Sequence, residues 1–193
     1  MTRYSVEHKD STRDRILKAA AKEFRSKGWA GATIPGIMET AGLTAGGFYK
    51  HFDSKSSLFA EMFRETLRKS IDKSLALKGK VPEGAWWEAM ARTYLDPAHR
   101  DNYRGGCVMA ALASDMPRAE PEAKRSVEDE LLRYVEVLAE SADESSTEAR
   151  AKAWAFQALL LGGLIMARGV ESDETAQEIL RACQQATGDL ATH

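Results

Sequence analysis

The feature that most constrains this fold is the spacing of its apolar residues, which recur every three or four positions along most of the chain. In residues 58–75 they form one continuous stripe, made of Leu58, Met62, Phe63, Leu67, Ile71 and Leu75. A helix of 3.6 residues per turn brings such positions onto one face. No segment of four to eight residues alternates apolar and polar residues as a half-buried strand does. The spacing therefore predicts an all-α protein.

Glycine and proline divide this pattern into about nine helices. Gly28 and Gly42 are placed to end the first two, because glycine readily adopts the left-handed conformation that stops a helix. The expected helices cover roughly residues 12–27, 33–41, 44–52, 54–78, 84–95, 106–116, 120–140, 147–168 and 173–188. We expect residues 1–10 to be a flexible N-terminus, followed by one domain over residues 11–56 and a second over residues 57–193.

Residues 33–52 have the length of a helix-turn-helix motif, and residues that start and end helices lie at the expected positions. A short helix ends at Gly42, a turn of three or four residues follows, and Thr44 caps the next helix. That third helix contains Gly46 and Gly47, although each glycine lowers helix stability by about 1 kcal/mol relative to alanine. Two explanations are open. The glycines let this helix pack closely on the first one, or they let its backbone approach a second surface, such as the major groove of DNA.

The side chains around these glycines favour the second explanation. Phe48 and Phe52 are four residues apart and share one helix face, so we expect them to be buried. Tyr49, Lys50 and His51 are then left near solvent, where they can donate hydrogen bonds to phosphate oxygens. Further candidates lie at helix N-termini, whose free N–H groups attract anions. The predicted DNA-binding residues are Thr33, Thr44, Ala45, Gly46, Gly47, Tyr49, Lys50, His51 and Lys55.

Charge is divided unevenly along the chain, whose formal net charge is only -2. Residues 1–56 contain 10 Lys or Arg and 6 Asp or Glu, a balance of +4, whereas residues 57–193 contain 17 and 23, a balance of -6. A basic first quarter with an acidic remainder is expected when one small part meets an anionic partner. We therefore predict that the N-terminal part binds double-stranded DNA.

Residues 12–60 resemble the DNA-binding domain of the TetR family of bacterial transcriptional regulators. The matching segments are RDRILKAAAKEFRSKGWAGAT and IMETAGLTAGGFYKHFDSKSSLF, and the most specific part is Y-x-H-F-x-S-K-x-x-L, from Tyr49 to Leu58. The resemblance implies a homodimer, usually a repressor, that places each third helix in a major groove of a palindromic operator and responds to a small-molecule inducer. The chain carries Ala45 and Gly47 where many members have Lys and Thr or Ser. We therefore expect few side-chain contacts to bases, and we expect DNA shape to contribute more of the sequence specificity.

The last two predicted helices are the candidates for subunit contact. Residues 147–168 are apolar nearly all round, and a helix that is apolar on every side needs partners on every side. The residues alone leave open whether this is an intramolecular core helix or a subunit interface. The resemblance favours pairing with residues 173–188 into a four-helix dimer interface. Its predicted residues are Trp154, Leu161, Gly162, Ile165, Ile179 and Cys183.

Aromatic and methionine side chains recur on several helices of the acidic part. At helical spacing, such residues form either a core or the lining of a pocket. Taken with the resemblance, a pocket between these helices would bind a small hydrophobic or aromatic inducer and shift the dimer to a state that no longer fits the grooves. The predicted ligand-binding residues are Trp86, Trp87, Met90, Tyr94, Tyr103, Cys107, Met109, Tyr134, Trp154 and Phe156.

Cys107 is open to two interpretations. It begins a predicted helix, and a helix N-terminus makes a thiolate more available. The alternative is a buried, small apolar residue. A Gly-Cys pair before an apolar helix also occurs in one branch of the family, some members of which respond to electrophiles or oxidants, so a thiol-based response is a minority hypothesis.

Other classes of protein are disfavoured by what the sequence lacks. There is no H-E-x-x-H, C-x-x-C or phosphate-binding glycine loop, so we expect no enzyme, no catalytic residue, no metal site and no cofactor. A helical adaptor without a DNA partner would leave the charge asymmetry unexplained. The longest apolar run, residues 153–167, contains Gln157 and is shorter than a membrane span of about 20 residues. Two cysteines without a signal peptide favour a cytoplasmic protein.

Overall fold

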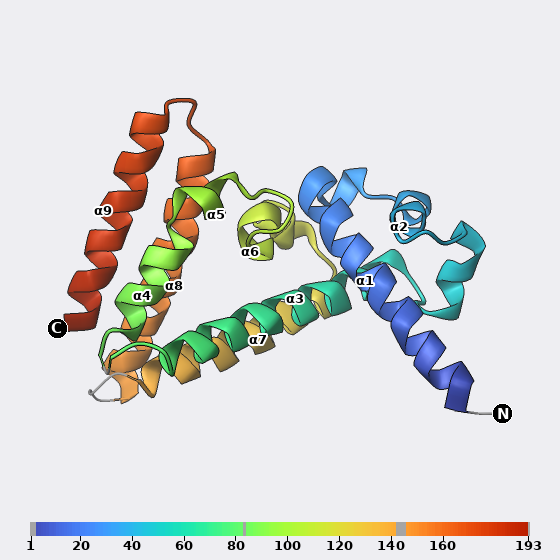
Figure 1. Ribbon diagram of the computed structural model, residues 1–193, viewed down its shortest axis with the longest axis horizontal. Helices are drawn as coiled ribbons and strands as arrows, with labels where there is room; N and C mark the ends of the chain where they lie inside the picture. Colours follow the sequence, from blue (N-terminus) through green and yellow to red (C-terminus); the bar gives the residue numbers. More distant parts are fainter. Residues whose placement is uncertain (1–2, 83, 142–145, 193) are drawn as a thin grey trace.

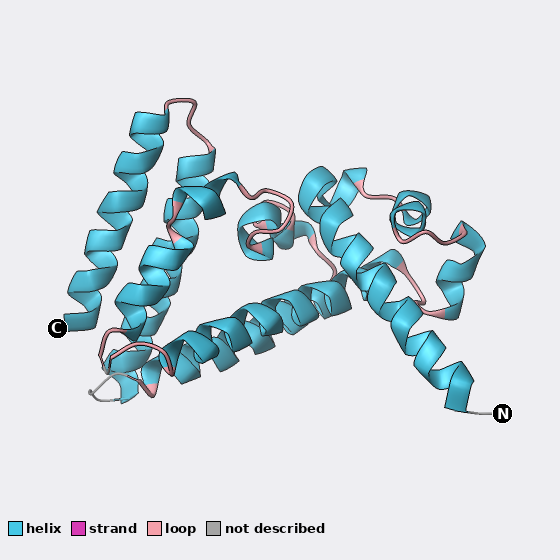
Figure 2. Cartoon of the chain, in the orientation of Figure 1, coloured by secondary structure: helices cyan, strands magenta, loops and turns pink. Residues whose placement is uncertain are grey.

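The structure, a computed structural model, describes residues 3–82, 84–141 and 146–192. These residues contain helices and loops and no strand, as Figure 2 shows, so the all-α prediction is confirmed. The elements in chain order, with η marking short 3-10 helices, are α1 (Arg3–Gly31), α2 (Ile34–Thr40), η1 (Ala45–Lys50), α3 (Lys55–Lys78), α4 (Trp86–Tyr94), α5 (Pro97–Asp101), α6 (Val108–Leu112), η2 (Met116–Arg118), α7 (Pro121–Ala139), α8 (Ser146–Arg168) and α9 (Asp173–Thr192).

The first three elements have the order expected of a helix-turn-helix motif. Thr33 caps α2, because its hydroxyl accepts a hydrogen bond from the backbone N–H of Gly36 at 3.2 Å. The turn after α2 contains Gly42, whose φ of 66° is in the left-handed region that favours glycine. The third predicted helix is the 3-10 helix η1, which is only six residues long. Two adjacent glycines lower its α-helical propensity, and short runs are where 3-10 geometry is common.

Two segments differ from what the sequence predicted. α1 begins at Arg3, earlier than the start near residue 12 that the sequence predicted, and no glycine or proline lies there to end it. The flexibility expected of residues 1–10 stays a prediction. Residues 1 and 2 lie outside the described residues. α5 is a helix that we did not predict. Asp96 starts it by accepting a hydrogen bond from the N–H of Ala98 at 2.8 Å, and Pro97 occupies its first turn.

The long helices α3 and α7 run side by side through the middle of the molecule and join its two ends (Figure 1). At one end, α1 packs on α3 and carries α2 and η1. At the other end, α8 and α9 form an antiparallel pair against α4. The short helix α6 lies between the ends and packs on both α1 and α8. α6 therefore links the part that carries the helix-turn-helix to the rest.

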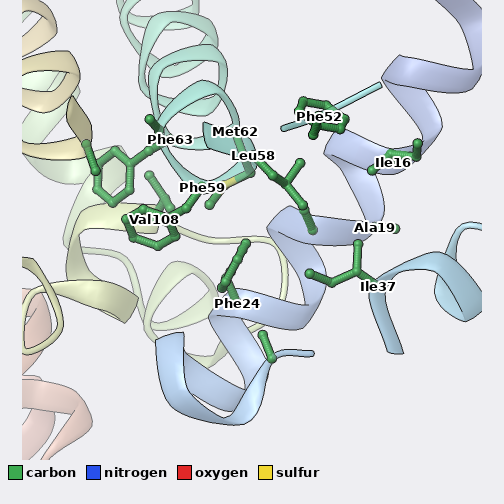
Figure 3. Close-up of a cluster of buried hydrophobic side chains, with 14 of the residues drawn as sticks. Ile16, Ala19, Phe24, Ile37, Phe52, Leu58, Phe59, Met62, Phe63 and Val108 are labelled. Atoms are coloured by element: carbon green, nitrogen blue, oxygen red, sulfur yellow. The ribbon is translucent and has the colours of Figure 1, made fainter. Parts of the chain in front are cut away.

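The first hydrophobic core crosses the predicted domain boundary at residue 56. Figure 3 shows Phe24 of α1 among Phe59 and Phe63 of α3 and Val108 of α6. The rings of Phe24 and Phe59 meet edge to face, with centroids 5.0 Å apart. Burying a large apolar side chain completely stabilises a fold by about 1.5–3 kcal/mol. Helices from both predicted domains therefore stabilise one another, and the division into residues 11–56 and 57–193 stays a prediction.

The second core joins α4, α7, α8 and α9. Within it, the ring centroids of Trp87 and Phe156 lie 4.7 Å apart. α9 comes very close to α8 at Gly163, where an added Cβ would lie 2.8 Å from the sulfur of Cys183. The residue at this crossing must be small, because real Cβ atoms essentially never approach another heavy atom that closely.

Candidate functional site

Two charged side chains of α1 hold the turn of the helix-turn-helix. Arg15 donates to the carbonyl oxygen of Ala41, at the end of α2, at 2.7 Å. Glu23 accepts from the hydroxyl of Thr40 at 3.0 Å. A hydrogen bond from Lys27 holds the pKa of the Glu23 carboxyl below its usual range, so this carboxylate stays charged. These contacts fix α2 on α1.

A third side chain of α1, Arg13, fixes the end of η1. Arg13 donates to the carbonyl oxygen of His51 and, at 2.9 Å, to the carboxylate of Glu61 on α3. Its guanidinium also lies 4.2 Å above the centroid of the Phe52 ring. Sequence reasoning missed Arg13 and Arg15, because their partners are 26 to 48 residues away and no local pattern indicates them.

The two faces of η1 are divided as the spacing predicted. Phe48 is 0% exposed and Phe52 is 4% exposed, and their rings lie 5.9 Å apart. Tyr49 is 68% exposed, with its ring edge-on to Phe48 at 5.1 Å. Lys50 is exposed next to it. The buried pair thus anchors η1 while Tyr49 and Lys50 remain available to another molecule.

The glycines of η1 are not required for close packing within the chain. A Cβ added at Gly46 would meet nothing within 4 Å. One added at Gly47 would lie 3.6 Å from the terminal methyl group of Met38, an ordinary van der Waals contact. Of the two explanations left open by the sequence, packing against α1 therefore fails. Approach of the η1 backbone to an external surface remains.

The structure places Lys55 differently from the other predicted DNA-binding residues. Its ammonium donates to the carbonyl oxygen of Trp29 and lies 4.4 Å from the centroid of the Trp29 ring. Burial lowers the pKa of the Lys55 ammonium, and nearby Asp115 acts in the opposite direction. Asp115 also accepts a hydrogen bond from the N–H of Trp29 at 3.1 Å. Lys55 and Asp115 thus clamp the end of α1, just after its kink at Gly28.

The remaining predicted residues are polar or backbone groups on successive elements, most of them exposed. Thr33 starts α2, and Thr44 starts η1 with no hydrogen bond from its hydroxyl to the helix end. Ala45 and Gly46 are exposed and His51 is half-buried. Hydroxyl, phenol, ammonium and backbone N–H donors in this arrangement suit an extended row of phosphates. That these groups bind an anion stays a prediction.

Most of the predicted ligand-binding residues lie in the interior. Trp86, Trp87, Met90 and Phe156 are buried in the second core, and Met109 packs against the first. Tyr134 contacts both cores, and its hydroxyl donates to the hydroxyl of Ser74 at 2.9 Å. Tyr103 is 54% exposed, with the Arg168 guanidinium 5.1 Å from its ring centroid. Trp154 is 39% exposed.

Cys107 lies where α4, α5 and α6 meet. Its backbone N–H donates to Nε2 of His99 at 3.2 Å, while Nδ1 of His99 lies 2.6 Å from the carbonyl oxygen of Tyr94. One ring nitrogen must donate and the other accept, so His99 is neutral. Burial raises the pKa of the Tyr94 phenol, with Cys107 beside it acting in the same direction. The Arg25 guanidinium of α1 is also near: burial lowers its pKa and Cys107 opposes this.

A hollow of about 470 Å³ opens between η2, α7 and α8. Trp154 is its only lining residue among the ten predicted ligand-binding residues. The full lining is Ala113, Met116, Pro117, Lys124, Val127, Glu128, Leu131, Leu132 and Trp154. A volume between about 300 and 1,000 Å³ is typical of small-molecule sites. Sequence reasoning missed most of these residues because they are ordinary aliphatic and charged positions of an amphipathic helix.

One face of α8 exposes apolar side chains to solvent. Trp154, Ile165 and Met166 are 39%, 38% and 60% exposed. Gly162 lies on the same face, since a Cβ there would meet nothing within 4 Å, and Leu161 is half-buried. The predicted interface residues Ile179 and Cys183 instead pack partly against the second core of their own chain. An apolar strip of this kind is typical of a surface that another protein covers.

Two other kinds of feature are absent from the parts of the chain that the structure describes. Within residues 3–82, 84–141 and 146–192, no helix is long and apolar enough to span a membrane. Over the same ranges, no three metal-ligating side chains come together.

Comparison with known proteins points to one family of regulators. Residues 16–62 match the family model described as bacterial regulatory proteins, tetR family. The chain is 34% identical over 90 residues to the uncharacterized HTH-type transcriptional regulator YfiR of Bacillus subtilis, covering 47% of this chain and 42% of YfiR. It is 40% identical over 58 residues to the HTH-type transcriptional regulator TtgR of Pseudomonas putida, covering 30% of this chain and 28% of TtgR. The chain thus spans less than half the length of these curated relatives.

Similar solved structures cover nearly the whole chain. The crystal structure of Escherichia coli NemR in its reduced form has a TM-score of 0.79 at 16% identity, covering 93% of this chain and 96% of NemR. A TetR transcriptional regulator from Chloroflexus aurantiacus has a TM-score of 0.77 at 22% identity, covering 97% of both chains. At these identities the likeness concerns the fold, which is shared from end to end.

Proposed function

Because this chain is a TetR-family DNA-binding transcriptional regulator, we propose that it acts as a homodimeric repressor in the cytoplasm. It binds a palindromic operator through two copies of η1, and a small hydrophobic or aromatic inducer releases it. The relatives and the fold are those of regulators rather than enzymes.

The observation that carries the DNA-binding role is the exposed end of η1. Tyr49 is 68% exposed beside Lys50, on an element anchored by two buried phenylalanines and by Arg13. A rigid support of this kind presents donors in one fixed geometry. Such donors suit the phosphate contacts that fix a protein's position and orientation on the DNA duplex. Thr33, Thr44, Tyr49, Lys50 and His51 are proposed to meet phosphates, and the backbone at Ala45, Gly46 and Gly47 to approach the groove. Lys55 is assigned a positioning role, because its ammonium is already bound to Trp29.

The exposed face of α8 supports the homodimer. Trp154, Leu161, Gly162, Ile165 and Met166 follow one another at intervals that keep them on one side of the helix. Two copies of this face would cover each other in an isologous interface, in which the same residues of both subunits meet. Ile179 and Cys183 support this interface from behind, by holding α9 against α8.

The inducer is proposed to act through α6, which lies against both α1 and α8. The hollow beside η2, with Trp154 in its wall, supports binding of an apolar molecule there. Displacement of η2 would move Asp115, whose carboxylate holds the end of α1. The movement of α1 would then shift the helix-turn-helix.

A thiol response through Cys107 is a second candidate for the releasing signal. The observation that favours it is the position of Cys107 between Tyr94, His99 and Arg25, at the junction of α4, α6 and α1. A bulky adduct on its sulfur would have to move at least one of these elements. If Cys107→Ser responds to alkylating agents as the unmodified protein does, this candidate is wrong.

The first experiment measures binding of the purified protein to DNA from upstream of its own gene, with scrambled competitor DNA, over a salt series. We expect tight, sequence-specific binding that weakens steeply with salt. Tyr49→Ala should lower operator affinity about ten- to a hundredfold, the range for a hydrogen bond to a charged group. Tyr103→Ala is the matched control, because Tyr103 is also an exposed tyrosine but lies far from η1 in the chain. Equal effects of the two substitutions would contradict the proposed DNA surface.

A further inference from the structure

One histidine side chain joins the end of α4 to the start of α6. His99 lies on α5, and both of its ring nitrogens have a partner. Nδ1 is 2.6 Å from the carbonyl oxygen of Tyr94, and Nε2 is 3.2 Å from the backbone nitrogen of Cys107. A carbonyl oxygen only accepts hydrogen bonds and a backbone N–H only donates them, so the ring proton must be on Nδ1. The arrangement therefore requires a neutral ring.

A protonated ring cannot make both of these hydrogen bonds. The imidazolium has a proton on each nitrogen, so Nε2 would become a donor that faces the N–H of Cys107. The contact with Tyr94 would remain, because Nδ1 keeps its proton. Uptake of a proton by His99 therefore breaks the connection to α6 and preserves the connection to α4.

The chain around the ring is too closely packed to absorb this change locally. At Gly106, next to Cys107, an added Cβ would lie 3.2 Å from Cδ2 of His99 and 2.5 Å from the carbonyl oxygen of Asn102. The guanidinium of Arg168 on α8 donates to the carbonyl oxygen of His99 at 3.0 Å and so fixes α5 from the other side. The repulsion between two facing donors must therefore be relieved by movement at the start of α6.

Titratable and charged groups face the ring from each neighbouring element. The Tyr94 ring of α4 meets it edge to face, with centroids 4.7 Å apart, and Cys107 faces Nε2 from the start of α6. Burial holds the pKa of the His99 imidazole below its usual range, and the Tyr94 carbonyl oxygen acts in the opposite direction. Arg168 of α8 lowers this pKa further, whereas Asp96 at the start of α5 raises it. His99 is thus neutral near pH 7 and takes up its proton only in acid.

The start of α6 is connected to the helix-turn-helix through the first core. Val108 directly follows Cys107 and is 2% exposed. Figure 3 shows Val108 in the same cluster as Phe24 of α1. α1 in turn carries α2 and η1. Movement at Cys107 therefore displaces Val108 against the helix on which the DNA-binding elements are mounted.

We propose that His99 is an acid-sensitive switch, which holds α6 in the DNA-binding arrangement when neutral and releases α6 when protonated. This inference rests on the proposed function and adds the proton as a releasing signal. The DNA-binding arrangement keeps His99 neutral, whereas a released ring titrates near pH 6.5, the ordinary value for histidine. Operator affinity is therefore complete above about pH 6.5 and falls as the pH decreases, by up to about tenfold per pH unit for each protomer.

The first measurement compares operator affinity between about pH 7.5 and about pH 5 for the unmodified protein and for His99→Gln, which takes up no proton in this range. The unmodified protein should lose affinity more steeply below about pH 6.5, with a difference of up to about tenfold per pH unit and protomer. His51 lies near the proposed DNA surface and is present in both proteins, so its own titration cancels in the comparison.

The second measurement needs no variant and no DNA. Nuclear magnetic resonance follows the ring signals of His99 and the backbone amide signal of Cys107 over the same pH range. Both should change with one common midpoint below pH 6.5. Protection of the Cys107 amide from hydrogen exchange, corrected for the intrinsic effect of pH, should fall at that midpoint because the N–H loses its acceptor. In His99→Gln, the Cys107 amide signal should not titrate.

Two results would overturn the inference: an equal loss of operator affinity in acid for both proteins, or a Cys107 amide signal that does not follow the His99 ring. If His99→Gln does not fold, the amide measurement on the unmodified protein decides alone. If the unmodified protein binds no operator selectively at about pH 7.5, the proposed function is wrong, whatever the Cys107 amide does. If it binds the operator and the amide does not titrate, only the switch is wrong.

Discussion

Adjacent glycines on α8 should respond in opposite directions to the same substitution. At Gly163, an added Cβ would lie 2.8 Å from the sulfur of Cys183 and 3.1 Å from a methyl group of Leu95. At Gly162, an added Cβ would meet nothing within 4 Å. Both are interior positions of one helix, where alanine is favoured over glycine by about 1 kcal/mol. Only Gly163→Ala also forces an overpacked contact.

The magnitude follows from these two effects. Overpacking in a well-packed interior destabilises by about 1–3 kcal/mol. Gly162→Ala should therefore stabilise by about 1 kcal/mol, and Gly163→Ala should be neutral or destabilise by up to about 2 kcal/mol. The difference between the two variants is the overpacking effect alone, because the helix propensity cancels. For a protein of this size, about 1–3 kcal/mol corresponds to a difference of roughly 2–12 °C in melting temperature.

The assay is thermal unfolding of both variants at one fixed protomer concentration, since the proposed dimer formation would make the melting temperature concentration-dependent. Sedimentation at that concentration reports whether Gly162→Ala, on the proposed subunit face, also changes the oligomeric state. Adding Cys183→Ala to Gly163→Ala removes the nearest atom and should restore part of the stability, with a coupling of at least about 0.5 kcal/mol. If Gly163→Ala melts at or above Gly162→Ala, or if no coupling is found, the close crossing of α8 and α9 is wrong.

Other predictions concern the contacts that hold α1 and α5. Asp115→Ala should destabilise by about 1–3 kcal/mol and weaken operator binding, because the N–H of Trp29 loses its acceptor; denaturant unfolding and DNA titration check both. Burial lowers the pKa of His99 below 6.5, so the unfolded chain takes up the proton first and stability is lost as pH falls below 6.5. His99→Gln should flatten that loss in melts across the acidic range. Arg168→Ala should increase amide hydrogen exchange in α5, because the carbonyl oxygens of residues 99 and 100 lose their donors; unchanged exchange would contradict this.

The parts of the fold that could be predicted from sequence are those set by local periodicity. The 3.6-residue spacing identified the long helices, and the expected segment 147–168 differs from α8 by one residue at its start. The same logic separated buried Phe48 from exposed Tyr49. It did not separate 3-10 from α geometry at η1, because the apolar spacing of a six-residue turn is almost the same in both.

The candidate site was harder to predict where a partner lies far along the chain. Lys55 has the composition of a phosphate ligand, yet its ammonium binds Trp29, 26 residues earlier. The apolar side of α9 could equally have faced a second subunit, and no local pattern indicates that Cys183 packs on Gly163 of its own chain. Such contacts depend on how helices cross, and helix crossing is set by packing rather than by the order of residues within one helix.

The first core limits how this regulator could be recombined with others. A hybrid made by joining two genes at the predicted boundary would be cut at residue 56. That junction would separate Phe24 from Phe59, Phe63 and Val108, which surround it in the intact protein. A working hybrid would have to keep α3 together with the DNA-binding part and recreate the surface of α6. The exchangeable module is therefore a packed unit that no single junction in the sequence can separate from the rest of the chain.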